Sequence, residues 1–314
     1  MPLPRVAIPT GDPAGIGPEI AVKAALDPAV RAICTPVLFT DPVVLRSHGL
    51  DATDVEIVEV PFKGKLQIGK IAADHGRAII ACAEAAIRAA LAGEFDAVVA
   101  APHTEAAIHA AGIEFDGYPS FVARVCGLPP EDGILMLCFQ HQGREVRIAH
   151  VTLHVSVSRA LGLMSKERIL GTIRAVHEVL GNPRIAVSGV NPHASEGGLF
   201  GDEEAKSVIP AIEQARREGI EVEGPIGADT LIQRPGFDAY VVMLHDQGHV
   251  AAKLLAPQRV AGLTIGTPVL FSSVAHGSAL DIAGQSRADH AAIVEAVTRL
   301  VGRRRRGGAT STAD

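Results

Sequence analysis

Three histidines each stand just past a segment that is predicted to be a buried β-strand. They are His154 after residues 147–153, His193 after residues 184–190, and His245 after residues 239–244. Ligands bind at the carboxyl edge of an open parallel sheet, because the loops at that edge converge on one crevice. Imidazole nitrogens are common ligands of divalent metal ions. The spacing therefore predicts that these three side chains meet at one edge and hold a single metal ion.

The structural alternative is that each histidine only caps a helix or packs against its neighbours. The sequence contains 13 histidines, so some coincidence is expected. The metal site is favoured because all three lie in polar or glycine-rich turns, at residues 152–156, 191–198 and 245–249. On the residues alone, both interpretations stay open.

Two further segments place polar groups in turns where a small molecule could bind. Residues 9–19 contain neither the Gly-Lys-Ser/Thr of a Walker loop nor the G-x-G-x-x-G dinucleotide fingerprint. This segment is either a tight strand-to-helix turn or a polar loop that lines the same crevice, with Asp12 as its candidate substrate residue. Residues 276–284, with Asp289 beyond them, are either a loop ending in a helix cap or a loop that wraps an adenosine.

The elements that must position these residues alternate between strand-like and helical patterns along almost the whole chain. Predicted strands are residues 5–9, 35–40, 95–101, 147–153, 184–190 and 239–244. Predicted helices are residues 18–26, 72–92, 166–180, 206–218 and 290–301. Such alternation is typical of an α/β protein with a largely parallel sheet, and 314 residues are enough for about two domains.

The composition argues against several classes of protein. A net charge of −6 argues against a nucleic-acid-binding protein, and the absence of Trp argues against base-stacking surfaces. Apolar runs fall far short of the ~20 residues that span a bilayer, so no membrane role is expected. Four widely spaced cysteines and a start without a signal peptide indicate a cytoplasmic protein. The four arginines at residues 303–306 are expected to form a solvated chain end rather than a nucleic-acid-binding tail.

Five separated segments, in order, resemble the 4-hydroxythreonine-4-phosphate dehydrogenase family of pyridoxal phosphate biosynthesis. They are residues 9–19, 191–198, 225–230, 245–248 and 276–284. The last segment is also similar to the adenosine-binding loop of isopropylmalate and isocitrate dehydrogenases. The resemblance implies a two-domain α/β fold of the isocitrate/isopropylmalate dehydrogenase type. In that fold, residues 1–110 plus 255–314 would form an outer α/β domain with the NAD loop. Residues 111–254 would form a central α/β domain with the metal ligands and the dimer interface.

The family likeness also implies cofactors, an oligomeric state and roles for individual residues. It implies an enzyme that uses NAD (or NADP) and one divalent ion, either Zn, Mg, Mn or Co, and that acts as a homodimer with its active site at the interface. His154, His193 and His245 correspond to metal ligands, while Lys253 and Asp229 correspond to polar groups beside the substrate and are the expected catalytic residues. The implied cofactor-binding residues are His276, Gly277, Ala279, Asp281, Gly284 and Asp289.

The chain departs from the family pattern where a phosphate would bind. Gly117-Tyr118-Pro119 replaces a Gly-His-Thr, Gly262 and Phe271 replace an Asn and an Arg, and Glu105 replaces a Lys. A phosphate monoester needs charged and neutral donors, so their loss predicts a more apolar substrate site. The expected substrate residues are Asp12, Tyr118, Pro119, Gly262 and Phe271.

One branch of the family resembles this chain more closely, namely the dehydrogenases of the terephthalate cis-dihydrodiol, 1,2-dihydroxy-3,5-cyclohexadiene-1,4-dicarboxylate. The shared segments are residues 117–120, 150–154, 191–197, 245–249 and 272–279. This likeness implies metal- and NAD-dependent oxidative decarboxylation of a carboxylated cyclic cis-dihydrodiol, giving protocatechuate and CO2.

Three alternatives to that function stay open. The first is the 4-hydroxythreonine-4-phosphate dehydrogenase of vitamin B6 biosynthesis or a related phosphorylated hydroxy acid dehydrogenase, with Arg124, Arg144 or Arg259 serving the phosphate. The second is a metal-dependent hydrolase that uses the same three histidines and an activated water. The third is a ligand-binding relative without catalytic activity.

Overall fold

The computed structural model describes residues 2–257, 260–274 and 276–301. Two sequence-based expectations lie outside these residues, namely the role of Arg259 and the solvated tail at residues 303–306. The chain divides into two compact units, and it passes from the first to the second after Leu128 and back again after Gly266. Unit 1 is therefore built from both ends of the chain, whereas unit 2 is one continuous stretch, Pro129–Gly266.

Unit 1 is organised around five parallel strands in the order β3-β2-β1-β4-β11. Their bounds are β1 (Arg5–Pro9), β2 (Thr35–Thr40), β3 (Glu56–Glu59), β4 (Ala97–Ala100) and β11 (Phe271–Val274). The central strands are fully buried, which explains why they read as continuous apolar runs rather than alternating ones.

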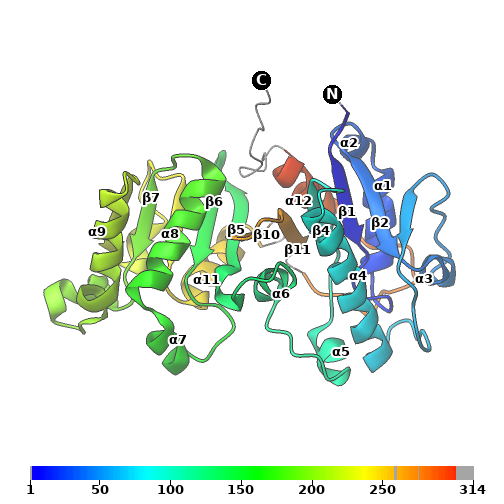
Figure 1. Ribbon diagram of the computed structural model, residues 1–314, viewed down its shortest axis with the longest axis horizontal. Helices are drawn as coiled ribbons and strands as arrows, with labels where there is room; N and C mark the ends of the chain where they lie inside the picture. Colours follow the sequence, from blue (N-terminus) through cyan, green and yellow to red (C-terminus); the bar gives the residue numbers. More distant parts are fainter. Residues whose placement is uncertain (1, 258–259, 275, 302–314) are drawn as a thin grey trace. The chain divides into compact units, whose positions relative to one another are not determined.

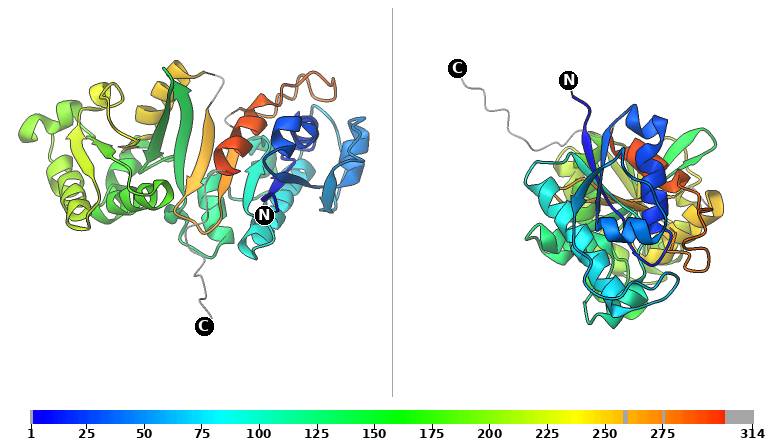
Figure 2. Two further views of the ribbon diagram at one scale, coloured as in Figure 1. Left: turned by 90° about the horizontal axis from the view of Figure 1, so that it is seen from above. Right: turned by 90° about the vertical axis from the view of Figure 1, so that its right-hand side faces the viewer.

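Helices cover both faces of the unit 1 strands (Figure 1). They are α1 (Gly17–Leu26), α2 (Pro28–Arg31), α3 (Pro42–Ser47), α4 (Ala73–Leu91), α5 (Glu105–Ala110), α6 (Tyr118–Val125) and α12 (Ala291–Val301). The long helix α4 packs on β1, β2 and β4 with α5 and α6 beside it. On the other side α12 lies against α1, as the red and blue helices in Figure 2 show.

Unit 2 contains six strands in the order β10-β5-β6-β9-β7-β8. Their bounds are β5 (Ile134–His141), β6 (Arg144–His150), β7 (Ile185–Ser188), β8 (Val222–Ile226), β9 (Ala239–Val242) and β10 (Ala261–Ile265). Strands β6, β9, β7 and β8 run parallel to one another, whereas β5 pairs antiparallel with both β6 and β10.

The helices of unit 2 also lie on both faces of its strands. They are α7 (Val157–Leu163), α8 (Lys166–Leu180), α9 (Ile209–Arg217), α10 (Ala228–Leu231) and α11 (His245–Leu255). Short helical turns are η1 (Pro130–Asp132), η2 (Pro192–Gly198) and a π-turn η3 (Glu204–Val208) that leads into α9. Tyr240 and Phe139 are completely enclosed in a core that includes Ala252 of α11, while α8 packs against α9 on the opposite side.

The α/β class expected from the sequence is confirmed, with differences at several element ends. The strand predicted at residues 147–153 is β6, which begins at Arg144 and ends at His150. The helix predicted at 206–218 starts two residues earlier, in a π-turn from Glu204. Among the residues that the structure describes, no helix combines the length and apolar character needed to cross a membrane.

Candidate functional site

Four neighbouring strands of unit 2 end at the same edge, because β6, β9, β7 and β8 are parallel. The predicted metal ligands follow three of them: His154 comes after β6, His245 begins α11 after β9, and His193 lies in η2 after β7. Asp229 follows β8, the fourth strand, as part of α10. The carboxyl edge of unit 2 thus carries four of the residues selected from the sequence.

Hydrogen bonds tie three of these strand ends together. Gln247, in the first turn of α11, accepts hydrogen bonds from the backbone N–H groups of Met243 (2.9 Å) and Leu244 (3.0 Å). Its side-chain N–H donates to the carbonyl of Gly189 after β7 at 3.0 Å. Thr152, after β6, donates its hydroxyl to the carbonyl of Met243 at 2.7 Å. These hydrogen bonds therefore connect the loops that carry the three histidines.

A cluster of imidazoles occupies this edge. The rings of His154 and His245 lie 5.6 Å apart, centroid to centroid. His249 stacks on His245, with ring centroids 3.8 Å apart and planes 6° apart. His150, at the end of β6, lies 4.8 Å from the ring of His249. The sequence reasoning missed His150 and His249, although the four-residue spacing of His245 and His249 on one helix face was a usable signal.

Burial governs the electrostatics of the two additional histidines. Burial, with the nearby His249 ring as a second cause, lowers the pKa of His150 to about 3. Burial and the neighbouring His245 ring lower the pKa of His249 to about 4. Nε2 of His150 is buried without a hydrogen-bond partner among the described residues, and a Cβ on Gly248 would lie only 2.2 Å from it. Glycine at position 248 is therefore what lets α11 approach this ring.

His193 is placed differently from the other two predicted ligands. Its side chain is 66% exposed, its Nδ1 lies 3.1 Å from a carboxylate oxygen of Glu196, and its ring meets Phe200 edge-on. Within the described part of the chain, no three His, Cys, Asp or Glu side chains lie close enough together to hold a metal ion. The structure thus brings His154 and His245 together, and His193 is on the same sheet edge without joining them.

The two expected catalytic residues lie in different places along this edge. Lys253 is exposed in the last turn of α11, four residues after His249 and eight after His245, so all three share one helix face. Its positive charge contributes to the lowered pKa of His249 and of Asp246. Asp229 is exposed in α10, which contacts the η2 turn that carries His193.

A second polar cluster lies at the carboxyl edge of unit 1. Asp12, in the loop after β1, is buried and accepts a short hydrogen bond from the hydroxyl of Thr104, which follows β4. Thr104 also lies 2.8 Å from the hydroxyl of Ser278, in the loop after β11. A Cβ on Gly15 would lie 2.6 Å from Cβ of Ser278, so the two loops can touch only because residue 15 is glycine. The polar loop at residues 9–19 and the expected adenosine loop are in contact.

The expected cofactor residues are mostly accessible in unit 1. His276, Gly277, Asp281, Gly284 and Asp289 are exposed, and Ala279 is half-buried in a left-handed conformation. Asp289 accepts a hydrogen bond from the N–H of Ala291 at 2.9 Å, so it also caps α12. Two residues that the sequence reasoning missed hold the end of this loop. Lys23 donates to the carbonyl of Ala288 at 2.9 Å, and the buried carboxylate of Glu19 accepts from the N–H of Ala288 at 2.7 Å.

All five expected substrate residues are buried, and four of them lie outside the polar cluster of Asp12. Tyr118, at the start of α6, and Phe271, on β11, have ring centroids 4.9 Å apart within the apolar core of unit 1. Burial raises the pKa of Tyr118 well above its usual range, and its hydroxyl has no hydrogen-bond partner among the described residues. Pro119 is buried beside it, and Gly262 lies within β10 opposite Leu137 of β5.

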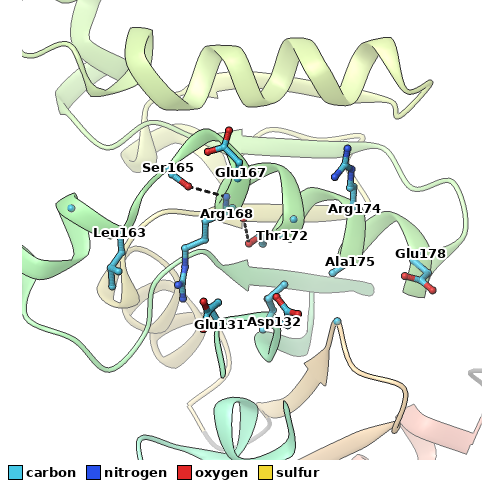
Figure 3. Close-up of a pocket in the computed structure, with 14 residues that line it drawn as sticks. Glu131, Asp132, Leu163, Ser165, Glu167, Arg168, Thr172, Arg174, Ala175 and Glu178 are labelled. Atoms are coloured by element: carbon cyan, nitrogen blue, oxygen red, sulfur yellow. Dashed lines mark hydrogen bonds between the residues drawn. The ribbon is translucent and has the colours of Figure 1, made fainter. Parts of the chain in front are cut away.

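One cavity of unit 2, about 630 Å³ in volume, lies along α8 and η1 (Figure 3). Its lining includes Glu131, Asp132 and Arg168, and the Nε of Arg168 donates to the carbonyl of Val151 at 2.7 Å. None of the residues selected from the sequence lines this cavity.

Comparisons with known proteins bear on the whole chain. Residues 21–300 match the family described as pyridoxal phosphate biosynthetic protein PdxA. The chain is 42% identical over 308 residues to the 1,2-dihydroxy-3,5-cyclohexadiene-1,4-dicarboxylate dehydrogenase of Comamonas sp., and the match covers 94% of this chain and 96% of that protein.

Solved structures agree with the sequence matches. A terephthalate 1,2-cis-dihydrodiol dehydrogenase from Burkholderia xenovorans LB400 is 40% identical with a TM-score of 0.71, over 95% of this chain and 98% of the other. A 4-hydroxythreonine-4-phosphate dehydrogenase from Klebsiella pneumoniae is 30% identical with a TM-score of 0.81, over 95% and 97%. An isocitrate dehydrogenase from Methylococcus capsulatus, 14% identical with a TM-score of 0.52, shares the fold alone.

The family match and the relatives extend over nearly all of the sequence. They confirm the resemblance inferred from the five segments and the expectation of a dehydrogenase, an oxidoreductase acting on a CH–OH group. The chain belongs to the PdxA family.

Proposed function

We propose that the chain is a metal- and NAD-dependent dehydrogenase of a carboxylated cyclic cis-dihydrodiol, such as the terephthalate dihydrodiol. The product would be protocatechuate, with loss of CO2. The observation that carries this proposal is the delivery of His154, His245 and His193 to one edge by three neighbouring parallel strands. The 42% identity to the Comamonas enzyme, over 94% of the chain, supports the dihydrodiol as substrate.

The residues at this edge suit a divalent ion. His154 and His245 have rings 5.6 Å apart, and the ring of His150, 6.5 Å from that of His245, has a buried Nε2 without a hydrogen-bond partner among the described residues. A set of imidazole nitrogens is the ligand chemistry of Zn²⁺ and related ions. When bound, such an ion supplies a Lewis acid that stabilises negative charge on a substrate oxygen.

The third predicted ligand supports a homodimer. His193 is exposed and stands apart from the His154–His245 pair, beside Leu199 and Phe200, which are 72% and 47% exposed. Large apolar side chains exposed next to a metal-ligating residue fit an interface at which a second copy of the chain completes the ligand set. The active site would then lie between two protomers.

The loop at residues 276–284 suits a nucleotide. Gly277 has open space around it, and Asp281 and Asp289 are exposed and could accept hydrogen bonds from ribose hydroxyls. When bound, NAD supplies the hydride acceptor. Lys23 and Glu19 would hold the end of this loop against α1 in the position that the nucleotide needs.

Two charged side chains of the protein, those of Lys253 and Asp229, would supply the remaining catalytic roles. Lys253 would hold a substrate carboxylate or carry a proton, because it is accessible and shares a helix face with His245. Asp229 would act on the metal or on a ligand from its place beside η2. Hydride loss from the secondary hydroxyl carbon adjacent to the carbon that bears the carboxylate yields a β-keto acid, which loses CO2 readily. In a cyclohexadiene the resulting enol is an aromatic catechol.

The partners of Arg124 and Arg144 favour a substrate with a carboxylated ring over one with a phosphate, because both guanidinium groups already interact with other groups of the protein. Arg124 is paired with Asp116 at 2.8 Å, and Arg144 donates to the carbonyl of Ile232 at 3.0 Å. Positions 262 and 271 carry glycine and phenylalanine, which bring no side-chain donor. Loss of one charged and one neutral hydrogen bond corresponds to roughly 3 to 5 kcal/mol, or about 10²- to 10³-fold or more in affinity for a phosphorylated substrate.

The alternative is oxidation of 4-phosphohydroxythreonine, the activity for which the Klebsiella relative is named. A direct comparison of NADH formation from the terephthalate dihydrodiol and from 4-phosphohydroxythreonine, each with Mn²⁺ and with EDTA, tests the proposal. We expect metal-dependent turnover of the dihydrodiol, with protocatechuate and CO2 as products. Equal or faster turnover of the phosphorylated amino acid would overturn the substrate assignment. Absence of NAD binding by fluorescence titration would instead point to a hydrolase, and absence of both metal and NAD to an inactive relative.

A further inference from the structure

The turn that carries His193 has an unusual backbone. Five successive residues, His193, Ala194, Ser195, Glu196 and Gly197, have φ angles of 52°, 53°, 69°, 46° and 70°. Four of them carry side chains, for which the left-handed region is disfavoured because Cβ approaches the following carbonyl oxygen. A run of this kind persists only where surrounding contacts hold it in place.

One buried carboxylate supplies those contacts. Glu204, in the π-turn η3, is 2% exposed. One of its oxygens accepts the backbone N–H groups of Val190 at 2.7 Å and Asn191 at 2.8 Å, just before the turn. The other accepts the side-chain N–H of Asn191 at 2.9 Å and a short hydrogen bond from the hydroxyl of Ser195, at the centre of the turn.

The turn also packs closely against Gly189, which follows β7 and is hydrogen-bonded to Gln247. A Cβ on Gly189 would lie 2.8 Å from Cα of Ala194 and 3.1 Å from a carboxylate oxygen of Glu204. Gly189 is the residue whose carbonyl accepts the hydrogen bond from Gln247. A continuous series of contacts therefore connects the start of α11, through Gly189 and Glu204, to the turn at His193.

We propose that Glu204 is a positioning residue for His193: by accepting four hydrogen bonds from the segment 190–195, its carboxylate holds the left-handed turn that aims this imidazole at a metal ion. The inference rests on the proposed function, because it takes His193 as a metal ligand. Glu204 touches neither metal nor substrate in this role, and it acts only through the backbone conformation of the turn.

A carboxylate is the group that this arrangement requires. All four partners donate, and the two oxygens of an ionised carboxylate have enough lone pairs to accept all of them. An amide at position 204 would keep one oxygen for Val190 and Asn191, but it would turn an NH2 group toward the side-chain N–H of Asn191 and the hydroxyl of Ser195. Glu204→Gln should therefore weaken the hydrogen bonds that hold the turn while filling the same volume. Glu204→Ala should remove all four of these hydrogen bonds.

The test measures metal binding rather than turnover alone. Glu204→Gln, Glu204→Ala and His193→Ala are compared with wild type in full-length protein, with Asp202→Asn as the matched control. Asp202 lies two residues away and is ion-paired with Lys206 on the surface at 2.6 Å, so the control removes the same charge without touching the turn. Co²⁺ affinity is measured by calorimetry, the Co²⁺ ligand set by visible absorption, and folding by circular dichroism of the metal-free proteins.

We expect Glu204→Gln to weaken Co²⁺ binding by 10- to 100-fold, the range for groups that orient a metal ligand, and to shift the cobalt absorption bands while the protein stays folded. Turnover of Glu204→Gln should recover at saturating metal, and Asp202→Asn should match wild type. Wild-type cobalt affinity and spectrum in Glu204→Gln, with His193→Ala impaired, would overturn the positioning role alone. Unchanged cobalt binding in His193→Ala would instead overturn the proposed metal ligand. If Glu204→Ala does not fold, Glu204→Gln carries the test.

Discussion

The side-chain amide of Gln247 donates a hydrogen bond to the carbonyl oxygen of Gly189 at 3.0 Å, and so joins the start of α11 to the end of β7. The same side chain accepts from the N–H groups of Met243 and Leu244. One residue thereby fixes the spacing between the loop of His245 and the loop of His193. The positions of the histidines therefore depend on these hydrogen bonds as much as on the strands that precede them.

Gln247→Ala should destabilise the protein by about 2 to 4 kcal/mol, because it removes three hydrogen bonds and leaves backbone groups of residues 243, 244 and 189 without their partner. Urea unfolding followed by circular dichroism measures this change. Gln247→Glu separates the two roles, since it keeps both accepting bonds but turns a carboxylate oxygen, which cannot donate, toward the carbonyl oxygen of Gly189. Equal stability of Gln247→Ala and wild type would show that water replaces the side chain.

Gly248→Ala should place a Cβ about 2.2 Å from Nε2 of His150, and that atom has no room to retreat because the ring is buried. We expect a loss of about 1 to 3 kcal/mol in unfolding free energy, the range for overpacking. Gly171→Ala in α8 is the control, since nothing lies within 4 Å of its added Cβ. There the same change should stabilise the helix by ~0.5 to 1 kcal/mol. Thermal unfolding of both variants checks the pair, and a stable Gly248→Ala protein would contradict the packing argument.

Lys253→Ala should reduce turnover by ~100-fold or more and leave the affinities for metal and NAD nearly unchanged, because the side chain is expected to act on the substrate. Steady-state NADH formation with separate titrations of metal and NAD distinguishes these effects. Lys253→Arg keeps a positive charge but cannot release a proton at neutral pH. Retained turnover in Lys253→Arg would indicate that the charge orients a carboxylate, and unchanged turnover in Lys253→Ala would remove the residue from the active site.

The acid stability of unit 2 should depend on Glu204. Burial alone would raise the pKa of this carboxyl group, but the hydrogen bonds from Ser195, Asn191 and Val190 outweigh burial and lower it. A lowered pKa in the folded state adds stability above the pKa of the unfolded chain, and this stability is lost as pH falls through the folded-state value. The unfolding free energies of wild type and Glu204→Gln should therefore differ at pH 7 and converge as the pH falls below 4.5, the ordinary pKa of a glutamate side chain. A constant difference, measured by urea unfolding, would show that folding leaves the pKa of this carboxyl group unchanged.

The positions of the histidines at strand ends could be predicted because the apolar pattern of a buried strand is a local property of the sequence. Residues 147–153, 184–190 and 239–244 read as buried strands, and parallel strands must end at one edge. The β5–β6 hairpin turns at Gln142-Gly143, with φ angles of 50° and 75°. Glycine suits such a turn, but glutamine in place of the usual Asn, Asp or Gly made its sequence signal weak.

The left-handed turn at His193 was outside the reach of such reasoning. Ala194, Ser195 and Glu196 have no preference for positive φ, and their conformation depends on Glu204, whose burial is a tertiary property. The same holds for Phe271. Its identity argues against a phosphate donor at that position, but whether its ring faces a ligand or the core depends on α4 and α6, and the structure encloses it in the core.

The division of the chain has a consequence for how the protein emerges from the ribosome. Unit 2 is one continuous stretch, whereas unit 1 needs β11 and α12, which follow unit 2 in the chain. Domains tend to fold as units during synthesis. The histidine edge can thus form while β4 still lacks its neighbour β11, and the Asp12–Thr104–Ser278 contacts form only after the segment beyond unit 2 has been synthesised. A chain whose synthesis stops shortly after Gly266 would therefore contain every residue of the histidine cluster but would lack the loop at residues 276–284.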